Sequence, residues 1–490
     1  TGIKELALKT RFGGFSLPAA GCGRGLLTTG VVAVAAFGIV VSMPTGTLRA
    51  ESLDQALVST YETNPTLRSA RARLRGTNER VPQESSNWRP QVSVNASAGR
   101  QRLEETQPSF SGGTTTTTEY TNPLTAELRL RQPLYRGGQT VAGVERAENE
   151  VKAQRGELEN TQQQVLQRAI EAYMNVWRDR RTVELSKDNV ETLRQQLEAT
   201  QARLEQGIAT QTDLAQARSR LSQAQARLER SRGDLTSSEA VYQEVVGTAP
   251  GEVSYPGVPD DLPGSREAAI ARAVDDNPRV VTAQFQQAAA EKRVRQTAGE
   301  LLPNVFLEGS LSYQEGRAGA ERKVERAQVT LNLQVPLYQG GQVTSRVREA
   351  KQQASERRIQ ILEARKRAEQ QAKSAWADLQ AARAELREIE QQVQTAQAAL
   401  TGVEQELQVG ARTVLDVLDA EQELFNAEVQ RVRARRDLVV AAYRVYSAIG
   451  QLTARGLQLE TEYYNPADAY EEVRGEWWSL SAPEAEAGKQ

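Results

Sequence analysis

The side chains that could do chemistry in this 490-residue chain are mainly carboxylates and guanidiniums, because it contains no histidine and a single cysteine, Cys22. Without an imidazole, the chain lacks the usual general base and the usual zinc ligand. The most suggestive carboxylates are Asp416 and Asp419, three residues apart in a run of helix-forming residues. That spacing allows both carboxylates to face the same side of a helix. We therefore predict no enzyme activity, no cofactor and no resident metal, and look for a role in which charge is sufficient.

A structural interpretation of the same acidic pair stands beside this one. Asp416 and Asp419 follow Gly410, so they also fit the solvent-exposed start of a helix, where carboxylates interact favourably with the helix dipole. The overall charge is nearly balanced, with 61 Lys and Arg against 63 Asp and Glu residues. Because nucleic-acid-binding proteins usually carry a basic excess, no nucleic-acid partner is expected.

The first 50 residues have the pattern of an export signal. Basic residues precede an uncharged, mostly apolar run over 25–43, and small and polar residues follow before Glu51. This order predicts a secretory signal peptide over residues 1–50. A retained membrane anchor is the rival interpretation, because the apolar run is just long enough to span a bilayer.

The rest of the sequence contains an internal duplication. The segment 52–57 with Asn64-Pro65 recurs 213 residues later as 265–270 with Asn277-Pro278, and Pro-Leu-Tyr-x-Gly-Gly-Gln at 133–139 recurs 203 residues later. We attribute the ten-residue difference to a Gly/Thr-rich tip over 111–118 in the first copy. The predicted domains are a first repeat (51–247), a linker (248–264), a second repeat (265–450) and a C-terminal tail (451–490).

Both repeats have the same predicted order of elements, which makes the fold mainly α with some β. A helical pair is broken at Asn-Pro, since the residue before a proline is disfavoured in a helix. A strand hairpin, a junction, a long helix of strong helix formers and a return helix follow. The hairpins are expected over 91–132 and 304–335, the long helices over 139–206 and 342–408, and the return helices over 211–246 and 413–449. The junction residues are Pro133, Gly137, Gly138, Pro336, Gly340 and Gly341, and the helix tips turn at Gly207 and Gly410.

The four predicted strands alternate apolar and polar residues, and we expect them to end by Pro133 and Pro336. Such strands suit either a sheet over a core or a barrel wall between lipid and water. Four strands cannot close a barrel, so a barrel would need strands from several copies. The long helices repeat apolar residues at coiled-coil spacing. Two hairpins that cap a coiled coil, as in a periplasmic adaptor, therefore remain an equal alternative.

The whole chain after residue 50 resembles the TolC family of outer-membrane efflux and secretion channels. The resemblance is carried by the Asn-Pro helices, the two Pro-Leu-Tyr-x-Gly-Gly-Gln junctions and the string Val-Gly-Ala-Arg-Thr-Val-Leu-Asp-Val-Leu-Asp-Ala at 409–420. It implies a homotrimer in which three chains pool four transmembrane strands each into a 12-stranded β-barrel in the outer membrane. A long α-helical coiled-coil barrel would continue it across the periplasm, and the early helices and the tail would form a belt around the tunnel.

The resemblance also implies roles for residues at the tips. Positions matching Asp416 and Asp419 form acidic rings at the constriction, which could hold a divalent ion, and positions matching Arg412 and Asp213 take part in a latch that keeps the tip closed. An Arg–Asp pair suits a latch because Arg can donate two hydrogen bonds to one carboxylate, although an ordinary surface pair contributes little. Leu407 departs from the family pattern, because it stands where a Tyr hydroxyl would join the latch.

These implications predict a passive, gated export channel of the outer membrane that extends into the periplasm. Its expected partners are outer-membrane lipid, a periplasmic adaptor (membrane fusion) protein and an inner-membrane transporter, ABC or proton-driven, which supplies the energy. The Leu-Tyr-x-Gly-Gly junctions and the tail resemble those of type I secretion channels, which favours protein secretion, and multidrug or other small-molecule efflux is the alternative. The alternative from another class is a periplasmic coiled-coil adaptor without channel activity. Trp477-Trp478 in the tail fits either a surface anchor or a small packing cluster.

Overall fold

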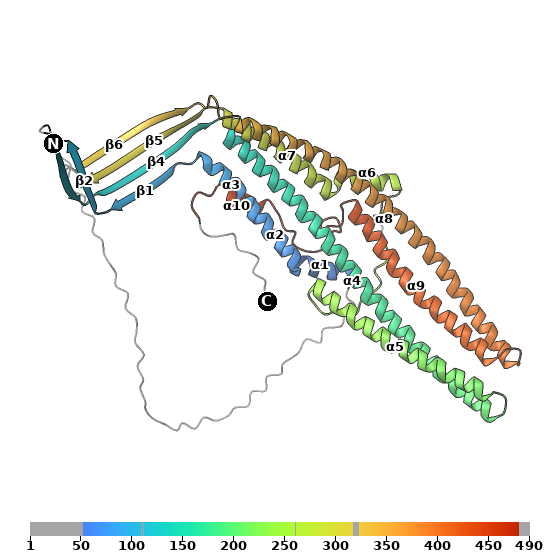
Figure 1. Cartoon of the computed structure of the whole chain (residues 1–490). Helices are drawn as coiled ribbons and strands as arrows, with labels where there is room; N and C mark the ends of the chain where they lie inside the picture. The colour runs from blue at the N-terminus through green and yellow to red at the C-terminus, as the bar shows by residue number, and fades with distance from the viewer. Residues whose placement is uncertain (1–51, 109, 111, 260, 317–322, 480–490) are drawn as a thin grey trace, which may run out of the picture. The chain divides into compact units, whose positions relative to one another are not determined.

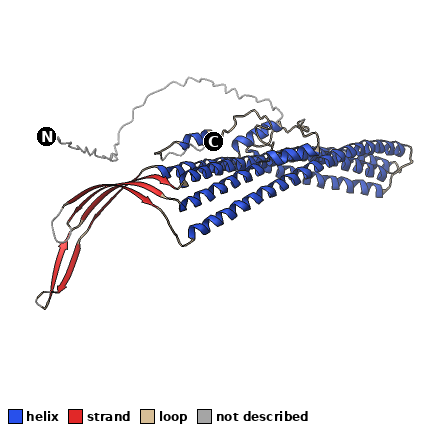
Figure 2. Ribbon diagram, turned by 90° about the horizontal axis from the view of Figure 1, so that it is seen from above, coloured by secondary structure: helices blue, strands red, loops and turns tan. Residues whose placement is uncertain are grey.

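The computed structural model describes residues 52–479 except 109, 111, 260 and 317–322. The predicted signal segment, residues 1–50, therefore lies outside the described residues. The described part is mainly helical with a smaller β portion, as Figures 1 and 2 show. None of its helices combines the length and the apolar composition needed to cross a membrane.

Four helices carry most of the chain. The long helices α4 (Gln139–Glu205) and α8 (Gln342–Gln408) contain 67 residues each, which corresponds to rods of about 100 Å. Each packs along its own return helix, α5 (Gln211–Val246) or α9 (Val414–Ala448), as Figure 1 shows. These helices lie where the sequence predicts them, within one residue at each end, because strong helix formers fill them and glycines bound them.

The short helices are broken at Asn-Pro in both repeats. The first repeat has α1 (Leu53–Thr63), α2 (Pro65–Asn78), α3 (Arg80–Ser85) and the 3₁₀ turn η1 (Ser86–Trp88). The second has α6 (Arg266–Asp276), α7 (Pro278–Ala298) and the 3₁₀ turn η2 (Gly299–Leu301). The tail adds α10 (Asp468–Arg474), which packs against α2 and α3.

The two asparagines that precede these prolines fasten the helix breaks. Asn64 caps α2 through the amide of Thr66, and its side-chain nitrogen donates 2.9 Å to the carbonyl of Val245. Asn277 caps α7 in the same way and donates 3.0 Å to the carbonyl of Ala448. Both asparagines are buried, so each joins a helix start to the last turn of the return helix in its own repeat.

One antiparallel sheet joins the two repeats. Its strands are β1 (Gln91–Ala98), β4 (Leu124–Arg136), β5 (Asn304–Glu315) and β6 (Val324–Gln334), in the order β1-β4-β5-β6. β4 continues past Pro133, where the sequence predicts its end, because the register with β5 shifts between Pro133 and Tyr135. A proline at such an irregularity does not have to donate a ladder hydrogen bond.

A second hairpin was missed by the sequence analysis, which predicts four strands. β2 (Gln101–Pro108) pairs with β3 (Thr114–Thr121) in a separate two-stranded sheet, so six strands are described (Figure 2). Part of the expected Gly/Thr-rich tip over 111–118 is therefore strand. Its Thr-rich sequence lacks apolar alternation, and nearly all of its side chains are exposed, so the pattern that reveals a half-buried strand is missing.

The four-stranded sheet has one apolar face and one polar face. The register aligns Val94, Leu128 and Leu311 across β1, β4 and β5 on the apolar side. This face is bare: Val94 is 71% exposed and Val329 of β6 is 74% exposed. The opposite face carries alternating charged and hydroxyl side chains around a hollow of about 540 Å³.

The main apolar core lies among α1, α4, α5, α9 and the tail rather than under the sheet. Its fully buried members include Leu57, Tyr173, Tyr242 and Leu452. The Tyr173 hydroxyl donates 2.9 Å to the carbonyl of Ser254, which fastens the segment after α5 to the long helix.

Candidate functional site

The helix tips are two similar turns. Gly207 and Gly410 adopt left-handed backbone conformations, with φ of 77° and 80°, which glycine reaches without strain. Thr210 and Thr413 then start the return helices, each by accepting a hydrogen bond from the amide three residues on. Both tips are therefore built by the same turn and the same capping box.

Asp416 and Asp213 complete these capping boxes. The Asp416 carboxylate accepts hydrogen bonds of 2.8 Å from the backbone amide and from the hydroxyl of Thr413. Asp213 accepts the corresponding 2.8 Å bonds from Thr210. The backbone amide of Thr413, followed by its hydroxyl and the charge of Arg412, holds the pKa of Asp416 below its ordinary value. Asp416 therefore supplies a permanent negative charge at the tip and also starts α9.

Asp419, one turn further along α9, faces α5. Its Oδ1 lies 2.5 Å from Nη2 of Arg220, so an ion pair crosses between the return helices of the two repeats. Sequence analysis missed Arg220. The residue of the second repeat that matches Arg220 is Glu423, which carries the opposite charge. The duplication therefore carries no signal for this contact.

Arg412 forms its ion pair within its own tip. Its Nε donates 2.8 Å to Glu406 across the turn between α8 and α9, and among the described residues no ion pair joins it to Asp213. Leu407 is partly buried against an apolar cluster at the tip. The cluster is built from α4, α5 and α9, and its buried members are Val183, Val190, Leu193, Ala217, Ala224, Leu228, Val414 and Leu418. Leu407, which the sequence analysis expected at the latch, thus makes an apolar contact in this chain.

Glu421 is a buried carboxylate near the tip that sequence analysis also missed. It is 8% exposed, and none of the described residues gives its Oε2 a hydrogen bond. Burial raises its pKa to about 7, and the charge of Glu404 on α8 adds to the shift. The sequence does carry a signal of this burial, because Glu421 stands three and four residues after Leu418 and Val417, on the apolar face of the helix.

The strand-to-helix junctions are glycine turns in both repeats. Gly137, Gly138, Gly340 and Gly341 all have positive φ, between 59° and 81°. A Cβ on Gly137 would lie 2.3 Å from the carbonyl oxygen of Gly299, so this turn also needs glycine for close packing. Pro336 follows the end of β6 at Gln334. Within the described residues, no group of three or more His, Cys, Asp or Glu side chains could hold a metal ion.

Known proteins share this arrangement. Residues 56–248 and 269–451 match the family model described as outer membrane efflux protein. Outer membrane efflux protein BepC of Brucella suis is 34% identical over 435 residues, covering 89% of this chain and 93% of BepC. Outer membrane protein TolC of Vibrio cholerae is 27% identical over 431 residues, covering 85% of this chain and 95% of TolC.

The fold agrees with solved structures as well. The crystal structure of the Campylobacter jejuni CmeC outer membrane channel matches with a TM-score of 0.71 at 15% sequence identity, covering 86% of this chain and 89% of CmeC. The two matched segments correspond to two copies of one fold, joined by the β4–β5 pairing. The chain therefore belongs to the outer membrane efflux protein family, the TolC-type channels of the outer membrane, which transport cargo and are not enzymes.

Proposed function

We propose that three copies of this chain form a passive conduit from the periplasm through the outer membrane. The observation that carries the proposal is the four-stranded sheet, whose apolar face is bare while its opposite face is polar. That division suits a wall between lipid and a water-filled lumen. Within the described residues, β1 pairs only with β4 and β6 only with β5, so both sheet edges are open. Pairing β6 of one copy with β1 of the next would close 12 strands and remove these edges.

The helices support the same assembly. α4 packs against α2 and α3 of its own repeat as well as against α7, whereas the main neighbours of α8 are α9, α7 and α6. Part of α8 stays bare, with Ile359 63% and Leu362 57% exposed. The α2–α3 segment of a second copy would cover α8 as it covers α4. This arrangement continues the sheet as a tunnel of paired helices.

The gate lies at the helix tips in this proposal. Three copies bring Asp416 and Asp419 into acidic rings that favour cations, while Arg412 and Asp213 meet between copies as a latch. Leu407 replaces a polar bond of that latch with apolar packing. A periplasmic adaptor protein and an inner-membrane transporter, ABC or proton-driven, open the tips and supply the energy. The cargo is either a secreted polypeptide or a small molecule, since a passive duct selects mainly by access from its transporter.

Conductance in a planar lipid bilayer tests the proposal. Purified protein should give discrete cation-selective steps that are small at rest. The double variant Asp416→Asn with Asp419→Asn should lose cation preference and block by divalent ions, while Glu229→Gln, which removes a charge from the exposed side of α5, should keep both. Folded protein that gives no steps would contradict the channel and favour a coiled-coil adaptor. Unchanged selectivity in the double variant would remove the two aspartates from the constriction.

A further inference from the structure

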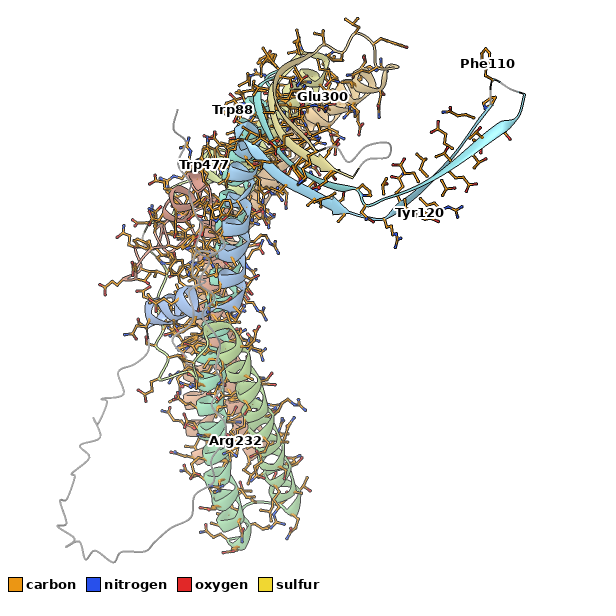
Figure 3. All side chains as sticks on the ribbon, turned by 90° about the vertical axis from the view of Figure 1, so that its left-hand side faces the viewer. Trp88, Phe110, Tyr120, Arg232, Glu300 and Trp477 are labelled. Carbon is orange, nitrogen blue, oxygen red and sulfur yellow. The ribbon has the colours of Figure 1, made fainter. Side chains whose placement is uncertain are left out.

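The C-terminal tail returns to the end of the sheet and is fastened there. After α10, which packs against α2 and α3, the carbonyl of Glu476 accepts a 2.8 Å hydrogen bond from Nη1 of Arg89. The guanidinium of Arg89 also lies over the ring of Trp477, 4.8 Å from its centre. Arg89 is two residues before β1, and Figure 3 shows Trp477 beside Trp88 where the helices end and the strands begin.

Three tryptophans at this place are left bare. Trp477 is 69%, Trp478 98% and Trp88 49% exposed. Arg89 holds Trp477 in place, so the exposure of this ring does not result from a loose chain end. Because large aromatic side chains are seldom left uncovered together on a protein surface, this patch points to a partner.

The position of the patch identifies the partner as a lipid surface. The apolar face of the sheet begins at Val92, which is 65% exposed, immediately after Arg89. In the second repeat, Leu301 and Leu302 occupy the places of Trp88 and Arg89 and are 43% and 45% exposed. Both junctions are therefore apolar at the level where the lipid-facing strands start. Tryptophan prefers the membrane–water interface, since its ring is apolar and its indole N–H is polar.

We propose that Trp477 and Trp478, together with Trp88, insert into the headgroup region of the periplasmic leaflet and set the depth of the sheet in the membrane. This inference rests on the proposed function, because it requires the sheet to span the outer membrane. Arg89 serves two purposes in it: it holds Trp477 and supplies a positive charge suited to lipid phosphates. The tail thus adds a membrane anchor that comes from outside the duplicated segments.

Quenching of tryptophan fluorescence by brominated lipid tests the anchor. The channel and the variant Trp477→Phe with Trp478→Phe are reconstituted in phosphatidylcholine vesicles that carry bromine either near the headgroup or near the chain end. The difference between the two proteins isolates the emission of the tail pair. We expect that emission to be largely lost with bromine near the headgroup and less affected by bromine near the chain end.

A matched control is Trp376→Phe, because Trp376 packs partly buried among α6, α8 and α9, away from the sheet. The emission that this variant removes should not be quenched by either lipid. Conducting channels whose tail emission is insensitive to both lipids would overturn the anchor and leave the proposed function intact. Protein that neither conducts nor floats with the vesicles would overturn both.

Discussion

Nη2 of Arg220 lies 2.5 Å from Oδ1 of Asp419, and this ion pair joins the return helices of the two repeats near their tips, one or two helical turns before Nη1 of Arg227 donates 2.7 Å to Oε1 of Gln422 between the same helices. Both side chains are partly exposed, so the pair contributes no more than about 1 kcal/mol to stability. Its importance is geometric, because it joins α5 to α9. Any opening that separates the two tips of one chain has to break it.

We therefore expect Arg220→Gln to increase the resting conductance while the unfolding temperature changes little. The substitution keeps the carboxylate of Asp419, so a change in gating cannot be caused by loss of the proposed acidic ring. Arg232→Gln is the matched control, because Arg232 pairs with Glu229 within α5 and joins no second helix. Single-channel recording checks both variants. Resting conductance equal to that of the wild type in Arg220→Gln would mean that the tips open as one unit.

Glu421 makes the stability of the tip depend on pH. Its pKa is about 7 in the folded tip against an ordinary value of 4.5, because burial disfavours the carboxylate. Between these values the folded tip keeps a proton that the unfolded chain releases, so stability falls as pH rises from 4.5 through 7 and then levels off. A shift of this size corresponds to at most about 3 kcal/mol.

Glu421→Gln should remove that dependence, since glutamine is neutral at every pH and similar in shape. Hydrogen exchange of the α9 amides, measured at pH 5 and pH 8, checks this. The wild type should exchange faster at pH 8 after correction for intrinsic rates, and the variant should show equal protection at both values. Glu423→Gln is the control, because Glu423 lies two residues further along α9 and is exposed, and it should behave as the wild type. A wild-type tip with the same protection at both pH values would show that Glu421 is hydrated.

The buried asparagines should matter more than ordinary helix caps. Asn277→Ala removes both the cap of α7 and the bond to Ala448, so we expect a loss of about 2 kcal/mol or more. Ser265→Ala is the control, because Ser265 only caps α6 through Ala268. Its loss should be about 1 kcal/mol. Thermal unfolding compares the two, and equal losses would mean that the bond from Asn277 to the return helix contributes nothing.

The helical part of the fold could be predicted because local rules decide it. Uninterrupted helix formers set α4 and α8, and the glycines at 207 and 410 set the tips. The β2–β3 hairpin could not be predicted, since strands with two exposed faces leave no alternating pattern. At the tip, the sequence placed Asp416 in the first turn of the return helix but carried no sign of the partner of Asp419. The Arg220 contact joins non-equivalent positions of the two repeats, and the burial of Glu421 depends on packing between helices.

The equivalent glycines of the two junctions provide a test of the assembly. Gly137 and Gly340 have nearly the same φ, 59° and 62°, so an alanine at either costs about 1 kcal/mol of left-handed strain. A Cβ on Gly137 would also meet the Gly299 carbonyl of η2 at 2.3 Å, whereas a Cβ on Gly340 meets nothing within 4 Å in the same chain. In the proposed ring, η1 of the next copy lies against Gly340 as η2 lies against Gly137.

Gly340→Ala should therefore destabilise the proposed trimer as strongly as Gly137→Ala, although within one chain a Cβ at residue 340 has free space. Thermal dissociation of the purified trimer compares the two variants. Gly138→Ala is the control, because Gly138 has a positive φ of 73° and nothing within 4 Å of its Cβ, so it reports backbone strain alone. If Gly340→Ala costs no more than Gly138→Ala, no neighbouring turn packs against Gly340, and the closed ring must be built from a different contact.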